Sequence, residues 1–301
     1  MRGATLYVTL EPCDHAGFTP PCSRGVIDAG IARVVVGAMD PNPRTAGGGV
    51  ARLRAAQIAV DVAEDPWSRE LVSDFALAIR SNRPYVLLKL ASSLDGYVAP
   101  RSGERHWLTG HAARAYVREL RATHDAVLVG AGTIRVDDAQ LSVRPPRARR
   151  KPYVRAVACE DAPVAAERAI FAPLEGYART MVLAPGGGRA SFAALEAVAD
   201  VVYVGSERDG RLDLRLALEA MRARGIASVL CEGGPTLAGH LLEANLVDRI
   251  DWLVAPALLG NPEAVPALRL GGRQAPLHFE RIGELGADVL LRARLNEASH
   301  V

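Results

Sequence analysis

The sequence predicts an α/β protein whose sheets are mostly parallel and whose chain forms two domains. Short apolar segments alternate along the chain with segments of helical periodicity, which is typical of βαβ architecture. The length of 301 residues suits two ordinary domains. A polar stretch at 81–84 separates two such series, so we expect domains over residues 1–83 and 84–301.

The first domain is expected to begin with a strand and then to alternate regularly. The turn Asp40-Pro41-Asn42-Pro43 and the glycines at 47–49 separate its elements. Its last helix opens at Asp65-Pro66 and carries apolar side chains on one face, namely Leu71, Val72, Phe75 and Ile79. The expected elements are a strand at 4–10, a helix at 23–29, a strand at 34–37, a helix after residue 49, a strand at 58–62 and a helix from 65 to about 81.

The second domain restarts with a strongly apolar strand at 85–90. Thr109 is expected to cap the helix that follows. That helix should turn Ala113, Tyr116, Val117 and Leu120 inward, and Arg114, Arg118 and Arg121 outward. Further strands are expected at 126–129, 154–158, 180–183, 201–204 and 228–231, with an antiparallel strand at 288–292.

The composition excludes several classes of protein. A net charge of +2 and a pI near 8.4 give no reason to expect nucleic acid or a membrane as a partner. No apolar run reaches the roughly 18 residues of a membrane span, and the N-terminus lacks the pattern of a signal peptide. Four cysteines do not make a disulfide framework in a chain of this length, and Lys89 and Lys151 are the only lysines. We therefore expect a cytoplasmic protein.

Two cysteines, Cys13 and Cys22, follow the first strand, and each comes directly after a proline. Thiolates are preferred zinc ligands, and zinc-bound hydroxide is the nucleophile of hydrolytic deaminases. The generic deaminase spacing is Pro-Cys-x-x-Cys, whereas eight residues separate the cysteines here. The pattern predicts that both cysteines bind zinc, against the alternative of two small core residues.

A zinc deaminase also needs a third ligand and a glutamate, which a His-x-Glu unit normally supplies upstream. None of the twelve residues before Cys13 is a histidine. We therefore expect either half of an active site or a sequence record that begins too late. His15 is better suited to face a substrate than to bind the metal, and Glu11 is a poor candidate for proton transfer.

Two glycine-containing turns follow strands of the second domain. In Cys231–Pro235 a strand leads into two glycines and then a proline at the first position of a helix, an arrangement that favours a bound phosphate. A plain strand-to-helix turn is the alternative. Gly130-Ala131-Gly132 resembles the dinucleotide fingerprint, but Arg135 stands in place of its third glycine. A Rossmann fold is therefore rejected.

Several motifs occur in a fixed order along nearly the whole chain. They are Thr9–Cys13 with Cys22, Asp40–Pro43, Lys89–Gly96, Ser102–Thr109, Val129–Asp138, Glu232–Gly239 and Ala255–Gly260. No single motif decides the matter, but the ordered set resembles the bifunctional riboflavin-biosynthesis deaminase–reductase family.

The resemblance implies a truncated cytidine-deaminase-like domain followed by a dihydrofolate-reductase-like domain. The first would deaminate a diaminopyrimidinone ribosyl phosphate with zinc, provided that the family's His-Ala-Glu motif, which lies outside this chain, is present. The second would reduce the ribosyl group of 5-amino-6-(5-phosphoribosylamino)uracil to ribityl with NADPH. The implied mechanism is direct hydride transfer to C1 of the ring-opened sugar.

The resemblance also assigns site residues, among which Asp137 is expected either to assist catalysis or only to bind the cofactor. The cofactor-binding positions are Ala91, Trp107, Thr133, Asp137, Gly234, Pro235, Thr236, Leu237, Ala238, Gly239 and His240. The substrate-binding positions are Arg105, Arg121, Leu141, Arg144 and Glu232, whose arginines suit a 5′-phosphate. Glu160 stands where a family member can place a small hydroxyl residue near NADP. Arg189, after three glycines, is a candidate for the 2′-phosphate.

Two other interpretations stay open at this point. One is a monofunctional reductase whose deaminase remnant only supports folding or assembly. The other is a nucleotide-binding regulatory protein without turnover, against which the retention of Asp137, Arg121, Arg144 and Glu232 argues. A homodimer is expected only because symmetric dimers are common among enzymes.

Overall fold

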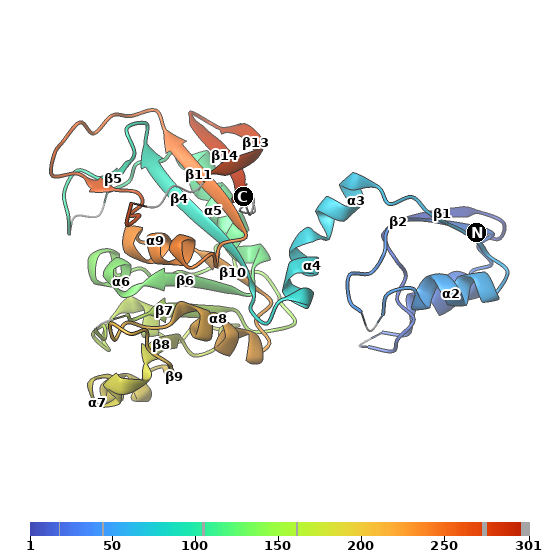
Figure 1. The fold of residues 1–301 in the computed structure, drawn as a ribbon, viewed down its shortest axis with the longest axis horizontal. Helices are drawn as coiled ribbons and strands as arrows, with labels where there is room; N and C mark the ends of the chain where they lie inside the picture. The colour runs from blue at the N-terminus through green and yellow to red at the C-terminus, as the bar shows by residue number, and fades with distance from the viewer. Residues whose placement is uncertain (18, 44, 104–105, 161, 273–275, 296–301) are drawn as a thin grey trace. The chain divides into compact units, whose positions relative to one another are not determined.

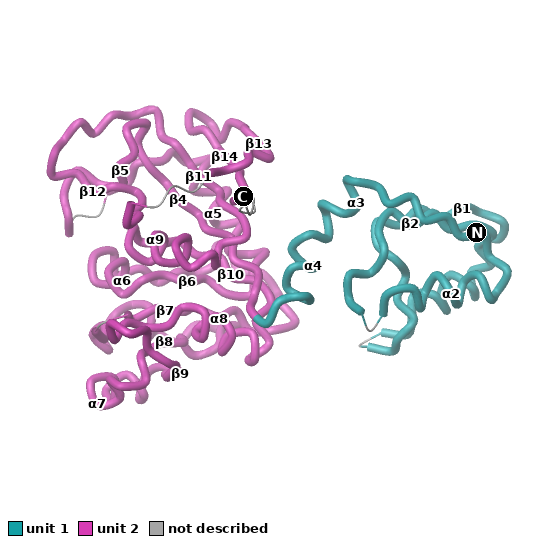
Figure 2. Tube along the Cα trace, in the orientation of Figure 1, with its two compact units in different colours: residues 1–82 teal, residues 83–301 magenta. Residues whose placement is uncertain are grey.

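The structure is a computed structural model that describes residues 1–17, 19–43, 45–103, 106–160, 162–272 and 276–295. The chain divides into two compact units, Met1–Asn82 (unit 1) and Arg83–Val301 (unit 2) (Figure 2). Each unit has a hydrophobic core of its own. Within these described ranges, no helix is long and apolar enough to cross a membrane.

Unit 1 is built on a parallel sheet with the strand order β1-β2-β3. Val34, Val36 and Leu53 are fully buried at the centre of its core. The strands and the first two helices confirm the elements predicted for this part of the chain. The elements are β1 (Thr5–Leu10), α1 (Cys22–Asp28), β2 (Arg33–Ala38), α2 (Gly48–Ala55), β3 (Ala59–Val62), α3 (Pro66–Leu71) and α4 (Ser73–Arg80).

The single helix predicted from Asp65 onward is wrong, because the chain forms two short helices there. Asp65 and Pro66 do start a helix: the Ser68 N–H donates to the Asp65 carboxylate at 2.8 Å, and Pro66 occupies the first helical position. Val72, with φ −104° and ψ 5°, leaves the helical region and separates α3 from α4. Leu71, a member of the predicted apolar face, is 66% exposed.

Unit 2 is organised around one mixed sheet in the order β13-β14-β11-β4-β10-β6-β7-β8-β9 (Figure 1). The strands from β11 to β9 in this order are parallel, and β13 and β14 form an antiparallel hairpin at one edge. The antiparallel strand predicted at 288–292 is confirmed as β14. The strands are β4 (Tyr85–Ser93), β5 (Tyr97–Ala99), β6 (Ala126–Gly130), β7 (Val154–Ala158), β8 (Met181–Pro185), β9 (Asp200–Val204), β10 (Ser228–Cys231), β11 (Arg249–Ala255), β12 (Val265–Pro266), β13 (Leu277–Leu285) and β14 (Asp288–Leu295).

Helices cover both faces of this sheet. Side chains of α8 and α9 pack on one face, in the core cluster that contains Val86, Leu88 and Val229. Side chains of α5, α6 and α7 belong to the clusters on the other face. The helices are α5 (His111–Thr123), α6 (Ala131–Asp137), α7 (Arg189–Phe192), α8 (Leu214–Ala223) and α9 (Pro235–Glu243), with short 3-10 helices at Ala169–Phe171, Gly186–Gly188 and Ala193–Ala197.

The start of α5 differs from the prediction. Thr109 does not cap this helix, because Gly110 is its N-cap residue and contributes no side chain. The Gly110 N–H donates instead to the carboxylate of Asp288 at 2.8 Å, and Asp288 is 2% exposed. A carboxylate from a distant strand thus replaces the local hydroxyl. The prediction that Arg121 faces outward is also wrong, since its guanidinium pairs with Glu232.

Strand β11 has no counterpart among the predicted elements, because charged residues interrupt its apolar pattern. Arg249 and Asp251 are nevertheless buried, with 6% and 0% exposure. Arg249 forms an ion pair with Glu280 at 2.8 Å, and Asp251 accepts a hydrogen bond from Arg292 Nε at 2.7 Å. Partners on β13 and β14, Glu280 and Arg292, therefore allow these charged side chains to lie inside the sheet.

Candidate active site

Three neighbouring parallel strands, in the order β4-β10-β6, bring their carboxyl ends to one edge of the unit 2 sheet. This edge is where open α/β sheets usually bind ligands. Lys89 lies on β4, Glu232 follows β10, and Asp137 ends the helix that follows β6. The sheet topology therefore gathers charged residues that are far apart in the sequence.

The two glycine turns predicted from the sequence lie against each other at this edge. The Gly130 N–H donates to the Gly233 carbonyl at 2.8 Å, and the Gly234 N–H donates to the Thr133 hydroxyl at 3.0 Å. Gly233 has φ +82°, a conformation that favours glycine, and the peptide bond that follows it is cis. The first turns of α6 and α9 thus lie side by side.

These two turns have the features of an anion site. The N-terminus of α9, a helix of nine residues, presents backbone N–H groups that have no partner within the helix. At the start of α6, nothing lies within 4 Å of the position that a Cβ on Gly132 would take. The backbone is therefore open to a ligand that carries phosphates, which fits the dinucleotide predicted for this place.

Arg121, in the last turn of α5, holds Glu232 with two guanidinium nitrogens. Its Nε donates to Oε1, and its Nη2 donates to Oε2 at 2.8 Å. The Glu232 side chain is only 9% exposed. Burial by itself raises the pKa of Glu232, but the charges of Arg121 and Lys89 more than reverse this, so its pKa lies below the ordinary range. Glu232 is thus an ionised carboxylate in a fixed orientation.

Lys89 is the third charged member of this cluster. It stands on β4 between Leu88 and Leu90, whose side chains enter the core on one face of the sheet. Because side chains alternate along a strand, Lys89 points to the opposite face. Burial lowers the pKa of Lys89, and the nearby carboxylates of Glu232 and Asp137 oppose that effect without cancelling it. An ammonium in this state gives up its proton more readily than a surface lysine does.

The remaining cofactor positions differ in their exposure. Ala91, which follows Lys89 by two residues on β4, packs against the core cluster under α5. Trp107 is 63% exposed, with the Arg114 guanidinium 5.5 Å from its ring centre. The predicted substrate residue Arg105 lies outside the described residues.

Leu141 and Arg144, two predicted substrate residues, belong to the segment after α6. Leu141 is 4% exposed, and its side chain packs in the core on the α6 face of the sheet. Arg144 is exposed and donates to the Ser142 hydroxyl at 2.8 Å and to the Gln140 side-chain oxygen at 2.7 Å. Of the two described arginines predicted to bind substrate, Arg144 is therefore the one that a phosphate can reach from solvent.

The predicted cofactor segment Gly234–His240 forms the N-cap and first turns of α9, as its proline indicated. Leu237, Ala238 and Gly239 in this segment are buried. A Cβ on Gly239 would lie 1.7 Å from the Arg269 carbonyl oxygen, so the close packing here requires glycine. These three residues support the helix from inside, which leaves its outer residues to face a ligand.

The sequence profile of the RibD C-terminal domain matches residues 84–291, more than half of the chain. This chain belongs to the RibD family. It is 36% identical over 310 residues to the riboflavin biosynthesis protein RibD of Escherichia coli (strain K12), in an alignment that covers 96% of this chain and 82% of that protein.

Solved structures of RibD proteins share its fold. Acinetobacter baumannii RibD (form 1) superimposes with a TM-score of 0.81 at 34% identity, covering 98% of this chain and 82% of that one. A Thermotoga maritima protein named diaminohydroxyphosphoribosylaminopyrimidine deaminase/5-amino-6-(5-phosphoribosylamino)uracil reductase gives 0.79 at 30% identity, covering 98% and 80%. Unit 2 therefore has the mixed-sheet, dihydrofolate-reductase-like fold of the RibD reductase domain, as predicted.

The two predicted zinc ligands of this RibD chain are neighbours in unit 1. The Cys22 N–H donates to the Cys13 sulfur at 3.4 Å. The hydrogen bond between the thiols, together with burial, raises the pKa of Cys22. A catalytic zinc normally has three protein ligands. In the part of the chain that the structure describes, no group of three or more histidine, cysteine or acidic side chains is arranged to hold a metal.

Glu11, next to this cysteine pair, has a structural role in the RibD chain. It is 3% exposed, and its carboxylate accepts hydrogen bonds from the Gly47 and Val50 N–H groups at 2.9 and 3.0 Å. These bonds fix the start of α2. They agree with the interpretation that Glu11 is not a proton carrier.

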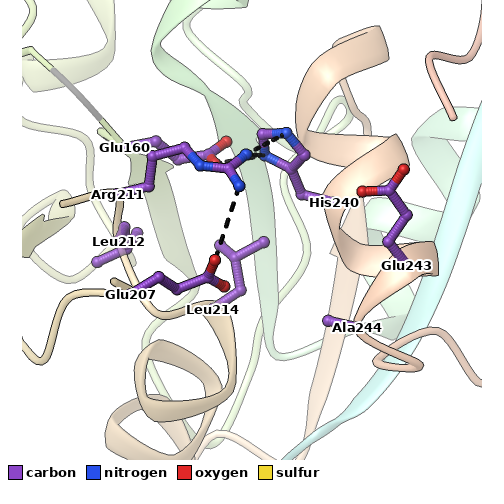
Figure 3. A pocket seen from close by; sticks show the side chains of 8 residues that line it. All are labelled: Glu160, Glu207, Arg211, Leu212, Leu214, His240, Glu243 and Ala244. Carbon is purple, nitrogen blue, oxygen red and sulfur yellow. Dashed lines mark hydrogen bonds and ion pairs between the residues drawn. The ribbon is translucent and has the colours of Figure 1, made fainter. Parts of the chain in front are cut away.

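His240 lies in a pocket of about 230 Å³ that is lined by α9, by Glu160 and by the segment 207–214, which leads into α8 (Figure 3). Its Nε2 lies 2.7 Å from Arg211 Nη1, and its Nδ1 lies 2.5 Å from the Glu160 carboxylate. A guanidinium can only donate, so Nε2 accepts and the Nδ1–H donates to Glu160. With the imidazole neutral, the carboxylates of Glu160, Glu207 and Glu243 face one guanidinium, which makes the pocket negative.

Lys89 is the charged site residue for which the sequence predicted no role. A usable signal was present, because Lys89 is one of only two lysines in the chain and interrupts the apolar run Tyr85–Leu90. A charged side chain inside a fully buried strand needs a partner or a function. That pattern could not show that Glu232, which follows β10, lies close to Lys89.

Proposed function

We propose that unit 2 reduces the ribosyl group of 5-amino-6-(5-phosphoribosylamino)uracil to a ribityl group with NADPH. The observation that carries this proposal is the cluster of Lys89, Arg121 and Glu232 at the same sheet edge as the two glycine turns. A proton donor thus stands at the edge that suits a dinucleotide. Membership of the RibD family supports the same reaction.

Bound NADPH supplies the hydride that reduces C1 of the sugar. The residues that would hold it are Thr133 and Gly234 at the joined turns, with the exposed ring of Trp107 as a further contact. The open backbone at Gly132 fits the phosphates. Arg189, whose guanidinium lies 4.5 Å from the ring centre of Tyr203, stays a candidate for the 2′-phosphate.

We assign proton transfer to Lys89, with Asp137 as its partner. Reduction of the ring-opened sugar adds one hydride at C1 and takes up one proton. Lys89 is the positively charged donor of the cluster whose pKa is lowered, which suits it to that transfer. The Asp137 carboxylate acts electrostatically on Lys89 and would orient its ammonium.

Arg144 would bind the 5′-phosphate of the substrate, because it is exposed and a guanidinium offers paired donors to phosphate oxygens. Arg121 has a different task, since Glu232 already occupies two of its nitrogens. It would hold Glu232 in place. The remaining lone pairs of Glu232 can then accept hydrogen bonds from the substrate. Leu141 stays a predicted substrate contact.

For the first domain, predicted over residues 1–83, we propose that Cys13 and Cys22 bind zinc. Adjacent thiols are soft donors of the kind that zinc prefers. A complete deaminase site needs a third ligand and a carboxylate for proton transfer. The described residues bring only two ligands together, so no deamination step is derived from them. Deaminase activity remains conditional on those additional groups.

The experiment that tests this function follows NADPH oxidation by absorbance. The substrate is either 5-amino-6-(5-phosphoribosylamino)uracil or its diaminopyrimidinone precursor, each with zinc present. We expect NADPH consumption with the uracil compound. Consumption with the precursor, accompanied by ammonia release, would show that the deaminase site is complete. Absence of consumption with the uracil compound would refute the reductase assignment.

Glu160 should weaken NADPH binding, and replacing it with serine should lower the NADPH Kd by roughly three- to tenfold. That change corresponds to about 1 kcal/mol, as expected for removing one repulsive charge near a phosphate. Fluorescence titration of the protein with NADPH and with NADH measures it. If the 2′-phosphate lies near this pocket, the gain is larger for NADPH than for NADH.

Glu207→Gln is the matched control, because it removes one negative charge from the same pocket at a more exposed position, with its side chain 47% accessible. It should change the NADPH Kd less than Glu160→Ser does. Equal effects of the two substitutions would mean that only the overall charge of the pocket affects NADPH binding. The prediction of a specific effect of Glu160 would then be wrong.

A further inference from the structure

We propose that Tyr177 and Arg155 are positioning residues that hold the segment 140–144 in the conformation required for substrate binding. This inference rests on the proposed function, in which Arg144 of this segment binds the substrate phosphate. Neither Tyr177 nor Arg155 faces that substrate in our proposal. Both side chains instead hydrogen-bond to backbone groups of the segment.

The segment needs such support because its backbone is strained. Asp138, just before it, has φ +44°, and Leu141 within it has φ +54°. Residues with a Cβ rarely adopt this left-handed region, and they persist there only where the surrounding structure compensates. The supporting contacts should therefore come from groups that are themselves fixed.

Tyr177 supplies the first contact. The Val143 N–H donates to the Tyr177 hydroxyl oxygen at 2.6 Å. The Tyr177 ring is fixed in turn by the buried ring of Tyr153, which it meets edge to face at 5.2 Å between ring centres. The hydrogen bond thus ties the middle of the segment to a rigid aromatic pair.

Arg155 supplies the second contact and links it to Arg144. Arg155 Nη1 donates to the Gln140 carbonyl at 3.3 Å. The Gln140 side-chain oxygen accepts a hydrogen bond from Arg144 Nη2 at 2.7 Å. A continuous path of hydrogen bonds therefore runs from strand β7 through Gln140 to the guanidinium that we assign to the substrate phosphate.

The environment of Arg155 supports a positioning role over a purely stabilising one. Arg155 is 1% exposed, and among the described residues no carboxylate forms an ion pair with it. Its Nη2 donates to the Ala172 carbonyl at 2.9 Å, and its guanidinium lies 5.4 Å from the Tyr177 ring centre. Burying an unpaired charge is costly, and an apolar side chain would fill this space without that cost. The guanidinium does what an apolar side chain cannot do, because its contact with the Gln140 carbonyl holds the segment and its contact with the Ala172 carbonyl holds the guanidinium itself.

The two tyrosines provide a matched experiment. The Tyr153 hydroxyl is buried and has no hydrogen-bond partner among the described residues, whereas the Tyr177 hydroxyl accepts the Val143 bond. Tyr177→Phe and Tyr153→Phe thus remove the same atom from neighbouring rings.

We expect Tyr177→Phe to raise the KM for 5-amino-6-(5-phosphoribosylamino)uracil about fivefold, as loss of one hydrogen bond predicts. The kcat and the NADPH Kd should stay within a factor of two, roughly the scatter of such mutants.

Tyr153→Phe should leave all three quantities unchanged. Arg155→Met should raise the same KM in the same direction as Tyr177→Phe, again with little change in the NADPH Kd. An equal KM for Tyr177→Phe and Tyr153→Phe would overturn the inference. A proportional loss of kcat and NADPH binding would also overturn it, since that pattern indicates general damage to the fold.

Hydrogen exchange of the Val143 amide gives a readout that needs no ligand. Exchange should be faster in Tyr177→Phe than in the wild type and unchanged in Tyr153→Phe. Unchanged exchange in Tyr177→Phe would refute the proposed contact. If the wild type does not bind the uracil substrate, the proposed function fails, and this measurement alone decides whether Tyr177 holds the segment.

Discussion

Replacing Lys89 with methionine should lower the kcat of NADPH-dependent reduction by about 10²- to 10⁴-fold, the usual cost of losing a positioned proton donor. The methionine side chain has a similar length but no ionisable group that can donate a proton. The unfolding temperature should not fall. Burial of the Lys89 ammonium is unfavourable, as its lowered pKa indicates, and the variant no longer has this cost. Steady-state kinetics and thermal unfolding on the same preparation check both expectations.

Lys151→Met is the natural control, since Lys151 is the only other lysine of the chain. Its side chain is exposed and donates to the Gly225 carbonyl at 3.3 Å, outside the charged cluster. This variant should retain the wild-type kcat. A Lys89→Met enzyme that keeps kcat within about threefold of the wild type would exclude proton transfer by Lys89.

The pH dependence of kcat should also show whether Lys89 donates the proton. Lys89 loses its proton at a pH below the ordinary lysine value of 10.5 in the folded protein. The kcat of the wild type should therefore decline as pH rises through this lowered pKa, and Lys89→Met should lack that decline. Between this lowered pKa and the ordinary lysine value, residue 89 binds more protons in the unfolded chain than in the folded protein. The free energy of unfolding of the wild type should then rise with pH relative to Lys89→Met.

Replacing Glu232 with glutamine should lower the free energy of unfolding by about 3–5 kcal/mol, because it leaves a buried guanidinium without its carboxylate. For a unit of this size, the corresponding fall in unfolding temperature is about 10 °C. Catalysis should also fall, since the cluster loses the charge that faces Lys89. Calorimetry measures the stability change, and NADPH oxidation measures the catalytic one.

The pair of Glu119 and Arg147 provides the control, because Glu119 lies in α5 as Arg121 does. It has the same two-pronged geometry, at 2.7 and 2.6 Å, but both side chains are about half exposed. Exposed ion pairs contribute little to stability. Glu119→Gln should therefore leave the unfolding temperature nearly unchanged. Similar shifts for both glutamine variants would mean that burial of Glu232 is not what makes its pair important.

The parts of the fold that local pattern determines could be predicted from the sequence. The apolar runs predicted the strands of the unit 1 sheet and the parallel strands of the unit 2 sheet except β11, and the Gly-Gly-Pro sequence at 233–235 located the start of α9. The glycines and the proline of Cys231–Pro235 indicated a phosphate site, whereas Gly130-Ala131-Gly132 was not accepted as a dinucleotide fingerprint. The structure adds the hydrogen bond between Gly130 and Gly233, which joins these turns.

The features that escaped prediction depend on partners distant in sequence. At the start of α5, the Asp288 carboxylate accepts the hydrogen bond that was expected for Thr109. Arg121 was predicted to face solvent, but it forms an ion pair with the buried Glu232. Periodicity assigns a charged residue to the surface, and it does not show that a carboxylate distant in the sequence lies close enough to form an ion pair with it. The family resemblance named Arg121 and Glu232 separately, but not as a pair.

The place of β4 in the sheet has a consequence for how this protein is made. Tyr85 pairs with Ser228 on β10, and Leu87 pairs with Arg249 on β11, so both neighbours of β4 are synthesised long after it. The nascent chain must carry an unpaired apolar strand for much of translation, a state prone to mispairing. Lys89 on β4 likewise meets Glu232 only once β10 has emerged. Reductase activity therefore arises late in synthesis, when the final third of unit 2 inserts a strand into a sheet begun long before.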